Sequence, residues 1–177
     1  VTGVQTCALP IWRVGEPGVA YGVILDAARR TKDEALFRRA VDIALQARAG
    51  DEALAATKAW RTVIAQSAEA LRTQLQILVA LNRLSDVQEP LTALLSMAPT
   101  EADRLILIQS LPRFFQRVSD AAEVPKLVER VLRPYLSVAS TQAAARVSLG
   151  RLWLSAGQYD RAMALATEAV KGAPQAT

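Results

Sequence analysis

Catalysis by side chains needs acids, bases or nucleophiles held close together, and this sequence supplies few of them. Its 177 residues include no histidine and a single cysteine, Cys7. Histidine general bases, Ser/His/Asp and Cys/His machinery and the usual zinc sites all need residue types that are missing here. The remaining candidates, Asp, Glu, Lys, Tyr and Ser, do not cluster. We therefore predict a protein that is not an enzyme and that holds no metal and no cofactor.

Two pairs of neighbouring carboxylates are the nearest approach to an acid–base site. Glu101 and Asp103 form one pair, and Asp51 and Glu52 form the other. Each pair directly precedes a stretch with helical spacing of apolar residues, and acids in a first helical turn interact favourably with the helix dipole. We interpret both pairs as helix-start residues and assign them no catalytic role.

The charge balance permits a nucleic-acid partner but does not favour one. The formal net charge is +4, and the 21 basic residues occur singly or in pairs along the whole chain. A nucleic-acid surface needs a basic stripe or patch, and none emerges from this distribution. We expect no nucleic-acid partner, and RNA binding by a helical repeat remains the less favoured alternative.

The elements that must position any functional residue are helices. Hydrophobic residues make up 51% of the chain and aromatic residues only 5%. Alanine and leucine dominate, and β-branched residues never gather into the short alternating runs of a strand. The fold class is therefore predicted to be all-α. No apolar stretch reaches the ~18 uncharged residues of a membrane span.

A repeat pattern is clearest between Leu149 and Pro174, which reads LGRLWLSAGQYDRAMALATEAVKGAP. Tetratricopeptide spacings are matched by Leu149, Gly150, Trp153, Gly157, Tyr159, Ala162, Ala169 and Pro174.

Each of these residue types has a physical role in a pair of antiparallel helices. Gly150 and Ala162 are small enough for the helices to approach closely, and Trp153 fills the space beside them. Gly157 provides a left-handed turn, and Pro174 ends the second helix. Large aromatic side chains at such positions are expected to be buried between repeats. This expectation covers Phe37, Trp60, Trp153 and Tyr159.

Weaker copies of the pattern extend upstream. The equivalent small or medium position of successive second helices falls at Ala20, Ala53, Val87, Val124 and Ala162. The intervals are roughly 33 to 38 residues, against ~34 for this class of repeat. The predicted architecture is a right-handed α-solenoid of about five tetratricopeptide-like hairpins over residues 12–177, with the first hairpin incomplete. Residues 1–11 resemble a translated sequencing adapter, and we expect them to be a non-native or disordered leader.

Helix boundaries are also predicted. Capping patterns place helix starts at Thr31 with Glu34, Thr100 with Asp103, Asp120 with Glu123, and Thr141. Pro112 falls inside an otherwise helical run and is expected to kink or split that helix near Ser110.

Candidate binding residues are sought on the first helix of each pair, which lines the concave face of such an array. Helical projection places five polar residues there, namely Arg38, Asp42, Arg72, Gln76 and Arg151. Guanidinium groups on this face would hold a carboxylate or the backbone carbonyls of an extended peptide. The alternative is that these residues only keep an exposed face soluble, and the sequence favours neither reading.

The stretch from Gly15 to Trp60 resembles the N-terminal repeats of a group of proteobacterial tetratricopeptide proteins. Members of that group are commonly outer-membrane lipoproteins that face the periplasm. The resemblance implies an adaptor that assembles a carboxyl-terminal processing protease and presents cell-wall hydrolases to it. It also implies a membrane association only through a lipid anchor upstream of this sequence. A cytoplasmic scaffold with a different client is the alternative.

Overall fold

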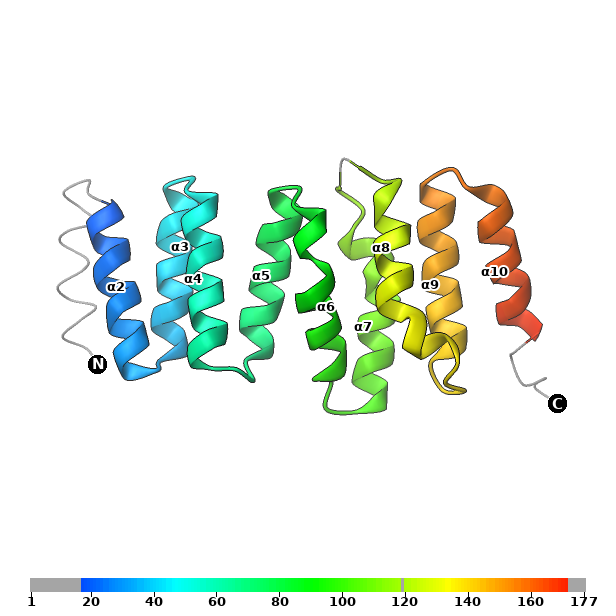
Figure 1. Ribbon diagram of the computed structural model, residues 1–177, viewed down its shortest axis with the longest axis horizontal. Helices are drawn as coiled ribbons and strands as arrows, with labels where there is room; N and C mark the ends of the chain where they lie inside the picture. The colour runs from blue at the N-terminus through cyan, green and yellow to red at the C-terminus, as the bar shows by residue number, and fades with distance from the viewer. Residues whose placement is uncertain (1–16, 119, 172–177) are drawn as a thin grey trace. The chain divides into compact units, whose positions relative to one another are not determined.

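The computed structural model describes residues 17–118 and 120–171, and every regular element in these ranges is a helix (Figure 1). The predicted all-α fold class is confirmed, whereas the predicted leader and Pro174 lie outside the described residues. The α-helices are α2 Pro17–Thr31, α3 Glu34–Gln46, α4 Gly50–Val63, α5 Ala68–Ala80, α6 Gln88–Ser96, α7 Glu101–Phe114, α8 Glu123–Leu132, α9 Gln142–Ser155 and α10 Tyr159–Lys171. Two 3₁₀-helices join them, η1 Leu84–Asp86 and η2 Arg133–Leu136.

The helices form two compact units, Val1–Ile77 and Leu78–Thr177. In the first unit α2 packs against α3 and α4, and α3 packs against α4. In the second unit α6 contacts α7 and α8, and α9 contacts α7, α8 and α10. Each unit is therefore built from antiparallel helices that pack on their near neighbours in sequence, as expected for helix hairpins. The right-handed superhelix stays a prediction.

The core of the first unit centres on two aromatic rings. Phe37 of α3 and Trp60 of α4 are fully buried and stack with ring centroids 6.0 Å apart and an interplanar angle of 8°. The Trp60 Nε1 donates a hydrogen bond of 3.2 Å to the Glu34 Oε1, so the buried indole keeps a polar partner. The expected burial of both rings is confirmed.

The same turn recurs where three first helices end. A single residue adopts a left-handed backbone in each turn, namely Arg48 (φ 57°), Asn82 (φ 55°) and Gly157 (φ 75°). The next amide then donates back across the turn, from Ala49 N to Ala44 O, from Arg83 N to Leu78 O and from Gln158 N to Trp153 O, at 2.8, 2.8 and 2.9 Å. This is the Schellman arrangement that closes helix C-termini. Its recurrence shows that three helix hairpins are closed in the same way.

One chemical change should have opposite effects at two glycines. Gly157→Ala should lower the free energy of unfolding by about 1 kcal/mol, because an L side chain is strained at positive φ. Gly22→Ala, inside α2, should raise it by about 0.5–1 kcal/mol, because alanine favours helix; a Cβ there would meet nothing within 4 Å. Urea unfolding of both variants measures the difference, and two changes of the same sign would contradict this account.

The predicted split of the helix near Ser110 is wrong, whereas the alternative of a kink stays a prediction. α7 continues through Pro112 to Phe114. Proline has no N–H, so it cannot donate to the carbonyl four residues earlier, which belongs to Ile108. That carbonyl instead accepts a hydrogen bond of 2.9 Å from the hydroxyl of Ser148 on α9. Ile108 and Ser148 are both buried, so a neighbouring helix replaces the bond that the proline removes.

Ser148→Ala should destabilise the protein by about 1–3 kcal/mol, because it leaves a buried carbonyl without its donor. In a Pro112→Ala background the backbone amide of residue 112 can donate to Ile108, so the same substitution should cost less. A double-mutant cycle by urea unfolding gives the coupling, expected to exceed about 0.5 kcal/mol. Ser155→Ala is the control, because that exposed hydroxyl only donates to the Arg151 carbonyl within α9. Additive effects of the two substitutions would contradict the compensation.

The helix starts follow the predicted caps in part. Thr100 caps α7 as expected, since its Oγ1 accepts a hydrogen bond of 3.1 Å from the Asp103 amide. Thr31 does not cap α3, because it is the last residue of α2 and its hydroxyl donates to the Ala27 carbonyl. Asp33 caps α3 instead by accepting from the Ala35 amide at 2.8 Å.

The remaining two starts lack side-chain caps. α8 begins at Glu123 after Ala122, and no side chain caps it, so the expected role of Asp120 is wrong. Thr141 precedes α9, but its buried hydroxyl donates to the Tyr135 carbonyl at 2.8 Å. Thr141 has helical backbone angles (φ −109°, ψ −18°) instead of the extended angles of a typical capping residue, and no side chain caps α9.

Candidate protein-binding surfaces

The carboxylate pairs occupy helix starts, as the sequence analysis expects. Asp51 and Glu52 lie in the first turn of α4, and Glu101 and Asp103 lie in the first turn of α7. Across residues 17–118 and 120–171, no three potential ligands gather around a metal position. Within the same residues, no helix combines the length and the apolar character needed to cross a bilayer.

Four of the five predicted binding residues lie on two consecutive first helices of the first unit. Arg38 and Asp42 stand one turn apart on α3, and Arg72 and Gln76 stand one turn apart on α5. All four are exposed. We call these four residues the α3/α5 face. Arg151 belongs to α9 in the second unit and is treated below with the groove that it lines.

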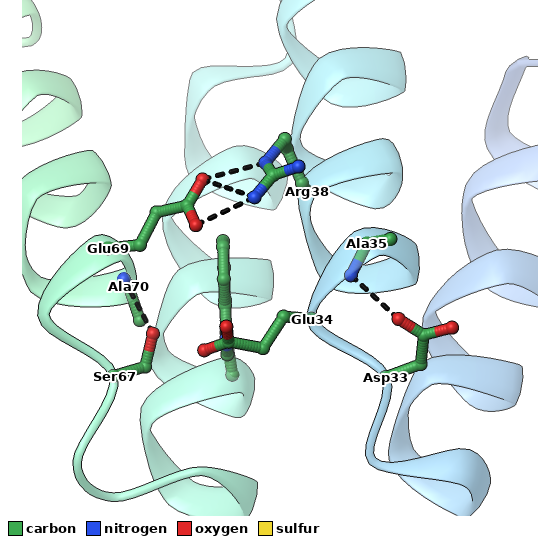
Figure 2. A network of polar contacts seen from close by, with 8 residues as sticks. Asp33, Glu34, Ala35, Arg38, Ser67, Glu69 and Ala70 are labelled. Atoms are coloured by element: carbon green, nitrogen blue, oxygen red, sulfur yellow. Dashed lines mark hydrogen bonds and ion pairs between the residues drawn. The ribbon is translucent and has the colours of Figure 1, made fainter.

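The two helices of this face are joined by an ion pair that sequence analysis missed. The Arg38 guanidinium reaches Glu69, in the first turn of α5, and forms a two-pronged contact (Figure 2). Its Nε donates to Glu69 Oε1 and its Nη2 donates to Glu69 Oε2, both at 2.7 Å. Such a fork fixes orientation as well as distance. The contact uses two of the five guanidinium donors and joins α3 to α5. The expected role of Arg38 as a ligand for a peptide stays a prediction.

Each member of the pair shifts the titration of the other. The hydrogen bond from Arg38 is the largest effect and holds the pKa of the Glu69 carboxyl below its ordinary value. Burial opposes this shift, and the charges of Arg38 and Arg72 add smaller lowering effects. The hydrogen bond to Glu69 likewise raises the pKa of Arg38. The pair is therefore charged throughout the physiological pH range.

Two further contacts hold α5 in place, one at its N-terminus and one with α4. The Ser67 Oγ accepts a hydrogen bond of 3.1 Å from the Ala70 amide and so caps the helix (Figure 2). The buried Gln74 accepts a hydrogen bond of 2.9 Å from Arg61 of α4. Gln74 is buried, whereas Arg72 and Gln76, which lie two positions before and after it in the sequence, are exposed. The orientation of the α3/α5 face thus depends on a capped and anchored helix.

The ion pair should give stability a small acid-dependent component. A lowered folded-state pKa means that the contribution of Glu69 is complete above the ordinary Glu pKa of about 4.3 and is lost as the pH falls through the lowered value. Both side chains are about half exposed, so solvent screens the pair and the effect is small. Urea unfolding from pH 7 to pH 3 should show a shallower loss of stability in Glu69→Gln than in the parent. Identical slopes would show that the pair does not contribute.

The predicted repeat-packing positions lie at or near the starts of the second helices. Four of them are buried: Ala20 in α2, Ala53 in α4, Val87 directly before α6, and Val124 in α8. Val124 is 3% exposed and the other three are fully buried. Ala162 holds the same place in α10 and is half-buried.

The other predicted packing residues lie between α9 and α10, with one exception. Trp153 and Ala169 are buried, and a Cβ added to Gly150 would be in ordinary contact with the Ala162 carbonyl at 3.6 Å, so its small size is not strictly required. The expected burial of Tyr159 is wrong, because 69% of this residue is exposed. Tyr159 is the first residue of α10 and lines an open groove instead of a helix contact.

That groove runs between α9 and α10 and encloses about 760 Å³. We call it the α9/α10 groove. Its lining comprises Ala143, Arg146, Val147, Gly150, Arg151 and Leu154 of α9, and Tyr159, Ala162, Met163, Ala166, Ala169 and Val170 of α10. Sequence analysis did not identify it, although the exposed apolar residues recur at helical spacing on both segments.

Comparisons with known proteins add little to this picture. No known protein family matches the chain, and no curated protein matches it. Among solved structures, the crystal structure of MamA is similar over 90% of each chain, with 12% sequence identity and a TM-score of 0.46. The tetratricopeptide-like spacing of the hairpins is therefore an inference from the sequence pattern.

Proposed function

We propose that the protein is a non-catalytic scaffold that binds partner proteins through the α3/α5 face. The observation that carries this proposal is the Arg38–Glu69 fork, which joins two consecutive first helices and leaves polar side chains exposed on both. Because the fork already joins the two helices that carry these side chains, less conformational entropy is lost when a partner binds across them. The α3/α5 face is thus suited to recognition.

The chemistry of the face favours an extended peptide that carries an acidic residue. The exposed Arg72 guanidinium can make a two-pronged contact with a carboxylate. One turn further along α5, the Gln76 amide can donate to and accept from a peptide backbone. Asp42 on α3 supplies an acceptor for a backbone amide or a basic side chain. The face can therefore pair with acidic and basic side chains of a peptide, and with the donors and acceptors of its backbone.

We further propose the cellular role that the family resemblance implies. In this role the protein is periplasmic, is tethered to the outer membrane by a lipid anchor upstream, and presents cell-wall hydrolases to a carboxyl-terminal processing protease. The support is the likeness of residues 15–60 to adaptors of that kind. A scaffold that holds a client beside a protease raises their effective concentration without performing chemistry itself.

Binding of the cognate carboxyl-terminal processing protease to the purified, immobilised protein tests both parts of the proposal. We expect saturable binding that Arg72→Glu weakens about tenfold, because the reversed charge repels the carboxylate that Arg72 would hold. Lys58→Glu is the matched control, since Lys58 is an exposed cation on α4, away from the α3/α5 face. It should bind like the parent.

The outcomes separate the two parts. Failure of the parent protein to bind the protease would overturn the proposed protease partner. Binding that Arg72→Glu and Lys58→Glu weaken equally would overturn the role of the face.

A further inference from the structure

The α9/α10 groove has the features of a second binding site. Five large apolar side chains that line it, Val147, Leu154, Tyr159, Met163 and Val170, are between 43% and 76% exposed. They lie side by side on two helices, and so they form one continuous apolar surface. Contiguous exposed apolar surface of this kind marks interaction sites in soluble proteins.

The second unit itself shows what fills such a groove. The preceding hairpin consists of α7 and α8, and α9 packs against both of them. α9 is further tied to α7 by the hydrogen bond from Ser148 to the Ile108 carbonyl. The space beside one hairpin is thus filled by a helix. The α9/α10 groove lies beside the next hairpin, and its walls are again two helix faces with residues three and four positions apart.

The chemistry of the walls also favours a helix over an extended peptide. The backbone amides and carbonyls of α9 and α10 are engaged within those helices, so the walls offer a peptide backbone few partners. An extended segment laid on this apolar surface would bury unpaired polar groups at considerable cost. A helix satisfies its backbone internally and presents only side chains. The α9 wall from Ala143 to Leu154 is roughly 16 Å long, about three helical turns.

The charges at the groove specify the occupant further. Its only charged lining residues are Arg146 and Arg151. Arg146 contacts Glu168 at 3.4 Å and donates to Gln142 at 3.0 Å, whereas no ion pair joins Arg151 to another of the described residues. A partner that covers this apolar surface comes to lie beside the Arg151 guanidinium. An Asp or Glu next to the apolar residues of the partner would therefore be favoured.

We propose that the α9/α10 groove binds an amphipathic helix of another protein, with apolar residues at positions i, i+3 or i+4 and i+7 and a flanking Asp or Glu that pairs with Arg151. This site is separate from the α3/α5 face and does not depend on the proposed function.

Two fluorescein-labelled synthetic peptides test the proposal. Both are designed helices with leucine at positions i, i+4 and i+7, and so share one apolar stripe; the first carries glutamate beside the stripe, and the second carries lysine at the same positions. Fluorescence polarisation with the full chain should show saturable binding, with the acidic peptide at least about tenfold tighter because opposite charges meet at Arg151. Circular dichroism should show that this peptide gains helix when it binds.

Variants of the full chain locate the site. Met163→Glu places a charge in the apolar wall and should weaken binding of the acidic peptide more than about tenfold. Arg151→Glu should reduce or reverse the preference for the acidic peptide. Ile106→Glu is the matched control, since Ile106 is 63% exposed on α7 and does not line the groove, and it should bind like the parent. Met163 is also mostly exposed, so both glutamates should be tolerated by the fold, which circular dichroism checks.

Three results would overturn the proposal. Equal binding of the two peptides would remove the role of Arg151, and unchanged binding by Met163→Glu would remove the groove. Light scattering that shows a dimer of the parent, dissociated by Met163→Glu but not by Ile106→Glu, would identify a second copy as the occupant. None of these results bears on protease binding at Arg72, so the two proposals fail separately.

Discussion

A pair of antiparallel helices cannot bury its own apolar face, and this constraint governs the structure. Each helix of a pair has one side against its partner and another side that must be covered by the next element. Within the second unit α9 meets this need for α7 and α8, and Val124 at the start of α8 is buried. Where no described helix provides the cover, beside α9 and α10, Ala162 stays half-buried and the larger apolar residues are exposed. The packing of α9 and the binding proposed for the α9/α10 groove both follow from this requirement.

Close packing between helices also allows the array to accommodate an irregular sequence. A proline in a helix removes one backbone donor, and an isolated helix would break or bend there. Pro112 does not break α7, because α9 lies near enough for Ser148 to supply the missing hydrogen bond. A tertiary contact thus overrides a local preference. The same closeness brings a polar hydroxyl into a buried interface, where it is tolerated because its donor has an acceptor.

The sequence predicts the elements and their periodicity better than the polar contacts between them. Helical spacing and the small residues at Ala20 and Ala53 depend on near neighbours in sequence, so the all-α class and the hairpin order could be derived. The continuity of α7 could not, because Ser148 lies 40 residues from Ile108 along the chain. Tyr159 fits the repeat pattern and is nevertheless exposed, because burial depends on what covers a residue as well as on its type.

The candidate site shows the same division. Helical projection placed Arg38, Asp42, Arg72 and Gln76 on neighbouring first helices, but it did not find Glu69, the ion-pair partner of Arg38. Glu69 had a sufficient local explanation as a first-turn acid of α5, and that explanation concealed its second role. An exposed ion pair of this kind contributes little to stability. Its other effect is geometric, since a two-pronged contact constrains the orientation of Arg38 on α3 relative to Glu69 on α5 as well as the distance between them. In the proposed binding mode, a peptide meets two helices that this contact already joins, so a pair that adds little to stability still contributes to preorganisation.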